Sequence, residues 1–378
     1  MDLEHIVNTK QKICNYCIMD DSAQEIQFFS NGCNFCISAK ERIKLEIIED
    51  SLRTKEIEKL VSKIKSNNQK YDCIIGVSGG VDSSYVAYIV KKKLKLNPLA
   101  VHLDNGWNSK KSTKNIYELL KKLKIDLVTH VVDWKEFREI QRSLLLSNIK
   151  NFEIATDHAI MSLMLQKAKK YKIKYILHGG NIATESIMPG SWMEPNYDFS
   201  LIKKIVSKYS NVKIKTLPHS NIISIFTSLF IRKIRLIPIL NYFPYNREDA
   251  LNLLESELSY EPYGEKHFES VVTKFFQSYL LPKKFNIDKR RAHLSSLIVS
   301  KQISRKKALE IVSESHYSST NEELDEKNYF LKKMKISNEE FETIMNDSSG
   351  LIIKSNLSFL HKPLIKYRSL IRKMIRKK

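Results

Sequence analysis

The sequence predicts an α/β fold on a parallel sheet, preceded by a small metal-binding module and followed by a helical region. Two observations lead to this prediction: short apolar segments alternate with amphipathic ones after residue 70, and two C-x2-C pairs lie near the N-terminus. Strands that alternate with helices build parallel βαβ units with right-handed crossovers. At 378 residues the chain is too long for one ordinary core, so we expect more than one domain.

The N-terminal cysteines have the spacing of a zinc site, C-x2-C-x15-C-x2-C. They are Cys14, Cys17, Cys33 and Cys36. Four thiolates close a tetrahedral shell around Zn²⁺, whereas disulfides are disfavoured in a reducing cytosol. An iron–sulfur cluster is the alternative that the spacing leaves open. We therefore expect a structural, zinc-ribbon-like module over residues 1–45, and a charged helical connector over 46–69.

The next segment, residues 70–244, alternates strand and helix. Strands are expected at 71–78, 97–106, 126–134 and 174–180, with a fifth at 211–218, and helices at 82–93, 112–124 and 155–172. Ligands in such sheets bind at the carboxyl ends of strands, where the polar clusters "SGGVDSS", "HLDNGWNS" and "HGGNIATES" lie. From residue 245 to 378 the pattern becomes mostly helical.

The cluster "SGGVDSS", residues 78–84, has the properties of a phosphate loop. Its glycines allow a sharp turn that points backbone N–H groups at one oxyanion, and a helix starting near Asp82 adds its positive end. The serines supply hydroxyl donors, and bound phosphates need a hard cation such as Mg²⁺. The loop lacks GxxxxGK[ST], so cleavage at the γ-phosphate is not expected.

This loop resembles the pyrophosphatase loop (PP-loop) of the N-type ATP pyrophosphatases. That resemblance implies a Rossmann-like sheet of the HUP type (adenine nucleotide alpha hydrolase-like), and ATP cleavage between the α- and β-phosphates. The wider sequence is similar to the N-acetyl sugar amidotransferases of surface-glycan biosynthesis. The similarity includes "VHLDNGWNS", "EIATDHAI", "HGGNIATES", "MPGSW" and the long block 263–310.

The resemblance implies that the enzyme converts an acetamido group to an acetamidino group on a nucleotide-activated or uronic sugar, as in lipopolysaccharide or O-antigen biosynthesis. The acetamido oxygen would attack the α-phosphorus and release pyrophosphate. Ammonia would then displace AMP from the O-adenylated imidate. Mg²⁺ and cationic side chains would supply most of the acceleration by electrostatic stabilisation.

The resemblance also implies roles for individual residues. ATP would be held by Ser78, Gly79, Gly80, Val81, Asp82, Ser83, Ser84, Asp104, Asn105, Gly179, Gly180 and Asn181. Mg²⁺ would be shared by Asp82 and Glu185. The catalytic residues would be Asp82, Ser83, Lys284, Arg290 and His293.

In this assignment Lys284, Arg290 and His293 belong, with Lys283 and Arg291, to a cationic block that closes over the phosphates. Asp157 and His158 are candidates for orienting sugar or ammonia, with a purely structural role as the alternative. Trp107 and Trp192 either stack on the substrate or are buried in the core.

No glutaminase arrangement is visible in this chain, because four cysteines are assigned to the metal and Cys73 lies on a buried strand. We therefore expect a separate glutaminase partner that delivers ammonia, together with a cyclase-like channel subunit. A tRNA-modifying enzyme of the lysidine-synthesis type is the alternative, favoured by the net charge of +21. Thiolating relatives need a cysteine beyond the loop, and none follows Cys73. Nucleic acid is therefore not the expected partner.

The N-terminus has no apolar signal segment, and basic residues interrupt the most apolar stretch, 221–245. These features predict a cytoplasmic protein without a transmembrane segment. The tail 361–378 carries eight Lys or Arg and no acid, so a solvated surface helix is expected there, with peripheral contact to an anionic membrane as the alternative.

Overall fold

The computed structural model describes residues 12–353 apart from 67–68, 195–197, 265–267 and 351–352. Its centre is a five-stranded parallel sheet with the order β5-β4-β3-β6-β7. The strands are β3 (Cys73–Gly76), β4 (Pro98–Asp104), β5 (Asp126–Val131), β6 (Tyr175–His178) and β7 (Arg235–Pro238). The chain builds outward from β3 to one edge and then returns to β6, so the topological switch point lies between β3 and β6. In open α/β sheets this is where ligands bind.

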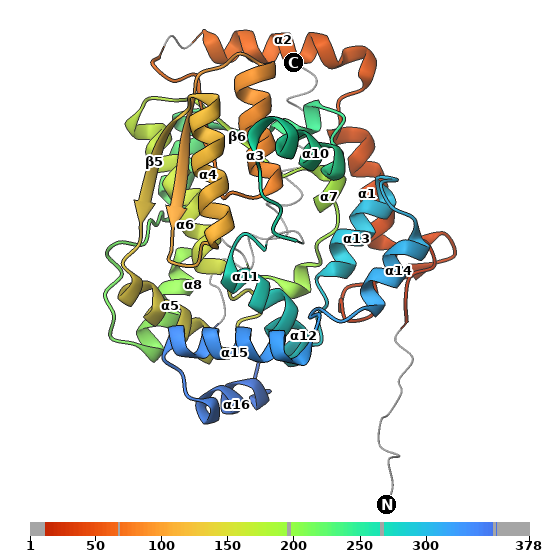
Figure 1. The fold of residues 1–378 in the computed structure, drawn as a ribbon, viewed down its shortest axis with the longest axis vertical. Helices are drawn as coiled ribbons and strands as arrows, with labels where there is room; N and C mark the ends of the chain where they lie inside the picture. Colours follow the sequence, from red (N-terminus) through yellow and green to blue (C-terminus); the bar gives the residue numbers. More distant parts are fainter. Residues whose placement is uncertain (1–11, 67–68, 195–197, 265–267, 351–352, 354–378) are drawn as a thin grey trace, which may run out of the picture.

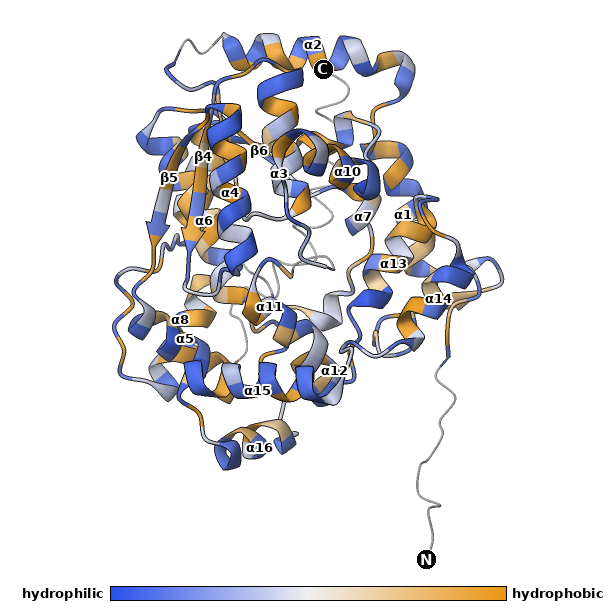
Figure 2. Cartoon of the chain, in the orientation of Figure 1, coloured by the Kyte–Doolittle hydropathy of each residue, from blue (hydrophilic) through white to orange (hydrophobic). Residues whose placement is uncertain are grey.

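Helices cover both faces of the sheet, as the alternation of side chains along β3 requires. Cys73 and Ile75 pack into one core and Ile74 into the other. The first face is covered by α2 (Asp50–Lys65), α3 (Val81–Tyr88), α4 (Lys110–Leu123) and α10 (Arg247–Leu258). The second face is covered by α6 (Ile154–Lys170) and α9 (Ile222–Phe226). Hydrophilic and hydrophobic residues alternate along α2 and α4, as expected of helices with one solvated face (Figure 2).

A helical layer lies beyond the carboxyl ends of the strands, toward which β5 points (Figure 1). It contains α5 (Trp134–Leu146), α8 (Phe199–Tyr209), α11 (Val271–Phe275), α12 (Leu281–Phe285), α15 (Thr320–Met334) and α16 (Asn338–Asn346). Aromatic packing holds this layer together: the rings of Phe275 and Phe330 stack with centroids 4.5 Å apart, and both side chains are buried. The expected helical C-terminal region is confirmed.

The N-terminal module lies against the C-terminal region. A short hairpin of β1 (Phe28–Phe29) and β2 (Gly32–Cys33) leads into α1 (Asn34–Glu46). Helix α1 packs on α13 (Arg290–Val299) and α7 (Ile182–Glu185), and α13 packs on α14 (Arg305–Ser313). Short helices of other types complete the described elements. They are π-helices at Ile89–Lys93, Thr227–Ile231 and Phe276–Leu280, and 3₁₀-helices at Gly190–Trp192 and Ile239–Tyr242.

The fifth strand is not where the sequence predicts it. Residues 211–218 form no strand; instead the backbone N–H groups of Lys215, Thr216 and Leu217 donate to the Glu136 carboxylate at 2.9 Å. A buried side chain thus satisfies the donors that a neighbouring strand would otherwise bind. The fifth strand is β7, which pairs with β6 at the sheet edge.

Among the residues that the structure describes, no helix is long and apolar enough to cross a membrane. The basic tail 361–378 lies outside the described residues.

Candidate active site and cysteine cluster

The phosphate loop is a tight turn between β3 and α3. Gly79 has φ +80°, and a side chain there would place its Cβ 2.4 Å from the Ser112 carbonyl oxygen. Only glycine fits this backbone and this close approach. Two tyrosines hold the turn from outside: Tyr260 Oη donates to the Gly79 carbonyl oxygen at 2.8 Å, and Tyr263 Oη accepts from Val81 N at 3.2 Å.

The loop hydroxyls converge on one point. Ser78 Oγ and Ser83 Oγ lie 3.1 Å apart, and Ser78 Oγ also accepts from Gly80 N at 3.2 Å. Ser78 Oγ donates in turn to Glu269 Oε1, 3.2 Å away. Ser84 differs, because its side chain is fully buried, its Oγ makes no hydrogen bond to the described residues, and it does not line the cavity described below.

Two acidic residues, Asp82 on α3 and Glu185 on α7, both act on the Tyr245 hydroxyl. Tyr245 Oη donates to Asp82 Oδ1. Burial raises the pKa of Tyr245, and the negative charges of Asp82 and Glu185 raise it further, so both carboxylates act on the same hydroxyl. The loop after β6 packs here as well, since a Cβ on Gly179 would lie 3.2 Å from Asp82 Cβ. This arrangement is compatible with the expected Mg²⁺ pair, which stays a prediction.

A cavity of about 350 Å³ opens beside the loop at the carboxyl edge of the sheet. One wall is formed by Ser78 and Ser83 of the loop and by Asn105 after β4. Further polar side chains of the lining come from α6, α11, the π-helical turn Phe276–Leu280 and the segments that precede α6, α11 and α13. These are Asn151, Glu153, Asp157, Glu269, Thr273, Gln277 and Lys289.

The acidic wall is electrostatically unusual. Glu153 and Asp157 lie one helical turn apart and both face the cavity. The pKa of Asp157 is raised to about 7, first by burial and then by the Glu153 charge, while Lys289 and Asn151 oppose the shift. Burial also raises the pKa of Glu153, whose carboxylate accepts from Thr273 Oγ1. The side chains of Glu153 and Asp157 are partly exposed, because both face the cavity.

The other expected nucleotide ligands differ in position. Asn105 lines the cavity and its Nδ2 donates to Thr156 Oγ1 at 3.2 Å. Asp104 is outside the lining; its Oδ1 accepts from Gly106 N at 2.9 Å and shapes the turn after β4. Asn181 caps α7 through Thr184 N at 2.9 Å.

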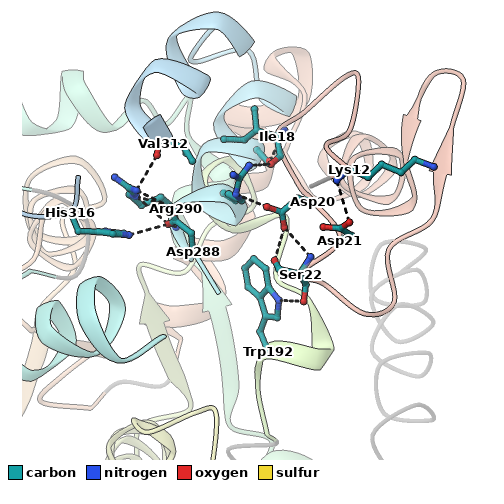
Figure 3. Close-up of polar contacts among 12 residues, drawn as sticks. Lys12, Ile18, Asp20, Asp21, Ser22, Trp192, Asp288, Arg290, Val312 and His316 are labelled. Carbon is teal, nitrogen blue, oxygen red and sulfur yellow. Dashed lines mark hydrogen bonds and ion pairs between the residues drawn. The ribbon is translucent and has the colours of Figure 1, made fainter. Parts of the chain in front are cut away.

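The cationic block does not close over the phosphate loop in this structure. Lys284 Nζ donates to the carbonyl oxygens of Ile344 and Asp347. Arg290 forms an ion pair with Asp288 at 2.8 Å and donates to carbonyl groups that include that of Val312 (Figure 3). Neither side chain lines the cavity. These cations stabilise the helical layer because their donors are satisfied by neighbouring backbone.

The remaining members of the block are also accounted for. Lys283 forms an ion pair with Glu323, and His293 is half-buried on α13 outside the cavity lining. The cation at the cavity is Lys289, which the sequence prediction missed. No sequence signal distinguishes it, since it lies in the same run as its basic neighbours.

Comparison with known proteins matches two segments of the chain. Residues 53–188 match the NAD synthase family model, and residues 269–367 match the model "LPS biosynthesis protein WbpG-like, C-terminal domain". The chain thus joins an NAD synthase-like PP-loop segment to a segment similar to the C-terminal domain of WbpG-like lipopolysaccharide biosynthesis proteins. We call residues 53–188 the PP-loop domain and residues 269–367 the WbpG-like domain. Residues of both domains line the cavity.

Individual proteins match only part of the chain, at low sequence identity. An uncharacterized protein of Methanocaldococcus jannaschii is 29% identical over 126 residues, 33% of this chain and 45% of that protein. A glutamine-hydrolyzing GMP synthase of Thermosipho africanus is 30% identical over 134 residues, 32% of this chain and 24% of that protein. The matched segments thus span less than half of these relatives. The NMN synthetase structure from Francisella tularensis is 13% identical with a TM-score of 0.31, over 60% of this chain and 91% of that one.

Arg291, the last cation of the block, does not line the cavity and instead joins the WbpG-like domain to the cysteine module. Arg291 Nε lies 2.6 Å from Oδ2 of the fully buried Asp20, and Arg291 also donates to the Ile18 carbonyl oxygen at 3.1 Å. Trp192 Nε1 donates to the Ser22 carbonyl oxygen at 3.2 Å on the same module (Figure 3). Removing one partner of such a buried pair leaves an uncompensated charge, so Arg291 acts in stability.

The aromatic candidates for substrate stacking are core residues. Trp107 is 1% exposed and its Nε1 donates to Gln141 Oε1 at 2.6 Å, and Trp192 is 3% exposed. Burial, rather than stacking on substrate, therefore describes both. His158 is also in the core, where its Nε2 accepts from Ser220 N at 3.2 Å and its ring stacks on Phe199.

The four N-terminal cysteines form one buried cluster. Their Sγ atoms lie within 4.8 Å of one another; Cys17 and Cys33 are 3.7 Å apart, and Cys14 and Cys36 are 4.0 Å apart. A tetrahedral shell with Zn–S bonds of about 2.3 Å separates its sulfur atoms by about 3.8 Å. Hydrogen bonds from Cys17 hold the pKa of Cys14 and Cys36 below the usual range. The donor set therefore fits a single metal ion.

Proposed function

We propose that this PP-loop amidotransferase converts an acetamido group on a nucleotide-activated or uronic sugar to an acetamidino group, with release of AMP and pyrophosphate. The observation that carries the proposal is the shared cavity. Ser78 and Ser83 of the PP-loop domain form one wall, and Glu269, Gln277 and Lys289 of the WbpG-like domain form another. A nucleotide on the loop and a sugar against the WbpG-like wall would therefore meet in one enclosed space.

The loop suits a leaving pyrophosphate. Its backbone turn and converging hydroxyls present donors to phosphate oxygens, and α3 starts at the same point. Mg²⁺ held by Asp82 and Glu185 would neutralise the charge that develops on the phosphates. An acetamido oxygen that attacks the α-phosphorus becomes a good leaving group, which makes the amide carbon open to ammonia.

We assign the cysteine cluster a structural Zn²⁺, held by Cys14, Cys17, Cys33 and Cys36. The sulfur atoms surround one point, as a single ion requires, whereas the thiolates of an iron–sulfur cluster bind different iron atoms. A four-thiolate shell leaves no open coordination position, so this metal takes no part in the reaction.

Ammonia is proposed to come from a separate glutaminase subunit, through a cyclase-like channel protein. The four clustered cysteines are committed, and Cys73 is fully buried on β3, where burial raises the pKa of its thiol. A buried neutral thiol is a poor nucleophile, so neither glutamine hydrolysis nor sulfur transfer is expected here. A cytoplasmic location, where ATP and nucleotide sugars are present, belongs to the same proposal.

The test is an incubation with ATP, Mg²⁺, ammonium and a panel of diacetamido nucleotide sugars. We expect AMP and pyrophosphate, and a sugar product in which NH replaces the carbonyl oxygen, identified by intact mass and NMR. Formation of ADP, or AMP release that does not depend on sugar, would contradict the mechanism. An unmodified tRNA substrate in a parallel reaction should give no AMP; if it does, lysidine-type chemistry is the better description.

A further inference from the structure

The Glu269 carboxylate lies against the phosphate loop, where an anionic ligand is expected to bind. Its Oε1 accepts from Ser78 Oγ at 3.2 Å, and a Cβ on Gly80 would lie 2.8 Å from the same oxygen. Glu269 is the first residue of the WbpG-like match, whereas Ser78 and Gly80 belong to the PP-loop domain. The carboxylate therefore reaches the phosphate loop from the other domain.

The backbone around Glu269 is firmly held, so this position is built rather than incidental. Ser109 N donates to the Glu269 carbonyl oxygen at 3.0 Å, and Val271 N donates to the Trp107 carbonyl oxygen at 2.9 Å. Between these two bonds, Ser270 and Asn108 form an antiparallel bridge. The segment thus extends the turn after β4 and fixes the carboxylate beside the loop.

The second carboxylate oxygen has no protein partner. Glu269 Oε2 is buried and makes no hydrogen bond within the described part of the chain. A buried acceptor without a donor costs free energy unless a ligand completes it. Burial raises the pKa of Glu269 and the nearby Asp82 charge acts in the same direction, while hydrogen bonds with Ser78 and Tyr263 oppose the shift.

We propose that Glu269 is a ligand of the divalent cation that accompanies the ATP phosphates, so that the WbpG-like domain completes the phosphate site of the PP-loop domain. An ionised carboxylate and a phosphate in one loop repel each other unless a cation lies between them. Carboxylate oxygens are the ligands that Mg²⁺ prefers. The inference rests on the proposed ATP site and adds a third acidic residue to it.

The experiment measures nucleotide binding, so it needs no sugar. ATP affinity is determined by calorimetry for the full-length wild type and for Glu269→Gln, once with Mg²⁺ and once with EDTA. The Gln side chain keeps the size and the bond to Ser78 but loses the charge. With Mg²⁺ we expect affinity to fall by roughly tenfold or more. With EDTA we expect it to rise, because the carboxylate that repels the phosphates is gone.

The opposite signs of the two effects make the outcomes distinct. If Glu269→Gln weakens ATP binding equally with and without Mg²⁺, Glu269 only shapes the loop and the inference is overturned. A variant that binds more tightly in both conditions, or is unchanged, overturns it as well, because the carboxylate then binds no cation. If the wild type binds no ATP at all, the proposed function fails first.

Two controls accompany the measurement. Glu255→Gln makes the same chemical change at an exposed position of α10 and should match the wild type in both conditions. Circular dichroism of each variant checks folding. Mn²⁺ binding in the presence of pyrophosphate, followed by electron paramagnetic resonance, provides a direct metal readout, and Glu269→Gln should weaken it.

Discussion

Asp157 and Glu153 both line the cavity, and the Glu153 charge opposes the ionisation of Asp157. The pKa of Asp157 is raised from 3.8 to about 7, first by burial and then by the Glu153 charge, while Lys289 and Asn151 oppose the shift. Between these pH values the folded chain binds a proton that the unfolded chain has lost. The free energy of unfolding therefore decreases as pH rises from about 4 to about 7, and the loss is complete above the folded pKa.

This difference predicts how Asp157→Asn behaves. The variant cannot ionise, so it should gain stability over the wild type at pH 8, on the order of 1 to 2 kcal/mol after allowance for water in the cavity. At pH 4 both proteins carry a neutral side chain and should unfold at the same denaturant concentration. Urea unfolding at the two pH values measures this. Equal destabilisation at both would show that the Asn side chain disrupts packing instead.

Lys289 and Lys284 form a matched pair, because both belong to the same basic run and only Lys289 faces the cavity. We expect Lys289→Ala to lower kcat/KM of the proposed reaction about 100-fold, since preorganised charges commonly contribute that much to transition-state stabilisation. Lys284→Ala should mainly lower stability, because it loses backbone contacts to α16 and the residue after it. Reversed results would restore the sequence-based assignment of Lys284 as catalytic.

The sequence could not have distinguished these two lysines. The loop residues were predictable because their chemistry depends on local order: glycines, serines and an aspartate directly after a strand. The facing wall depends on tertiary packing, so Lys289 and Glu269 carry no local signature. Only Glu153 had a recognisable signal, since it precedes Asp157 by one helical turn in "EIATDHAI".

At the scale of elements, the sequence predicted those strands that consist of a local run of apolar residues. It failed where contacts with distant parts of the chain determine whether a segment forms a strand. Strands β3 to β6 fall within the predicted segments. The error at 211–218 arose because Glu136, far away in sequence, satisfies that backbone, while β7 has only four residues and pairs at an edge. Such a short edge strand is visible only once its neighbour is placed.

The cysteine module also gives a prediction at this scale. Elemental analysis should find about one zinc and no iron per chain, because the four sulfur atoms surround a single point. Removal of the metal with a strong chelator should unfold the module and break the contacts of Asp20 to the WbpG-like domain and of Ser22 to Trp192. Thermal unfolding before and after chelation tests this. Iron with a visible absorption band would instead support the iron–sulfur alternative.

The whole molecule joins two matched domains around one cavity, with the cysteine module packed against the WbpG-like domain, and the proposal above takes ammonia from a separate subunit. Free ammonium should therefore support the reaction, with a rate that rises with pH in proportion to unprotonated ammonia. Glutamine should not support it with this chain alone. Once a glutaminase and its channel partner are added, glutamine should sustain turnover, and the steep pH dependence should flatten because ammonia arrives neutral. Turnover with glutamine and the isolated chain would contradict this prediction. It would mean that the chain contains a nucleophile for glutamine hydrolysis, and Cys73 would be the first residue to test.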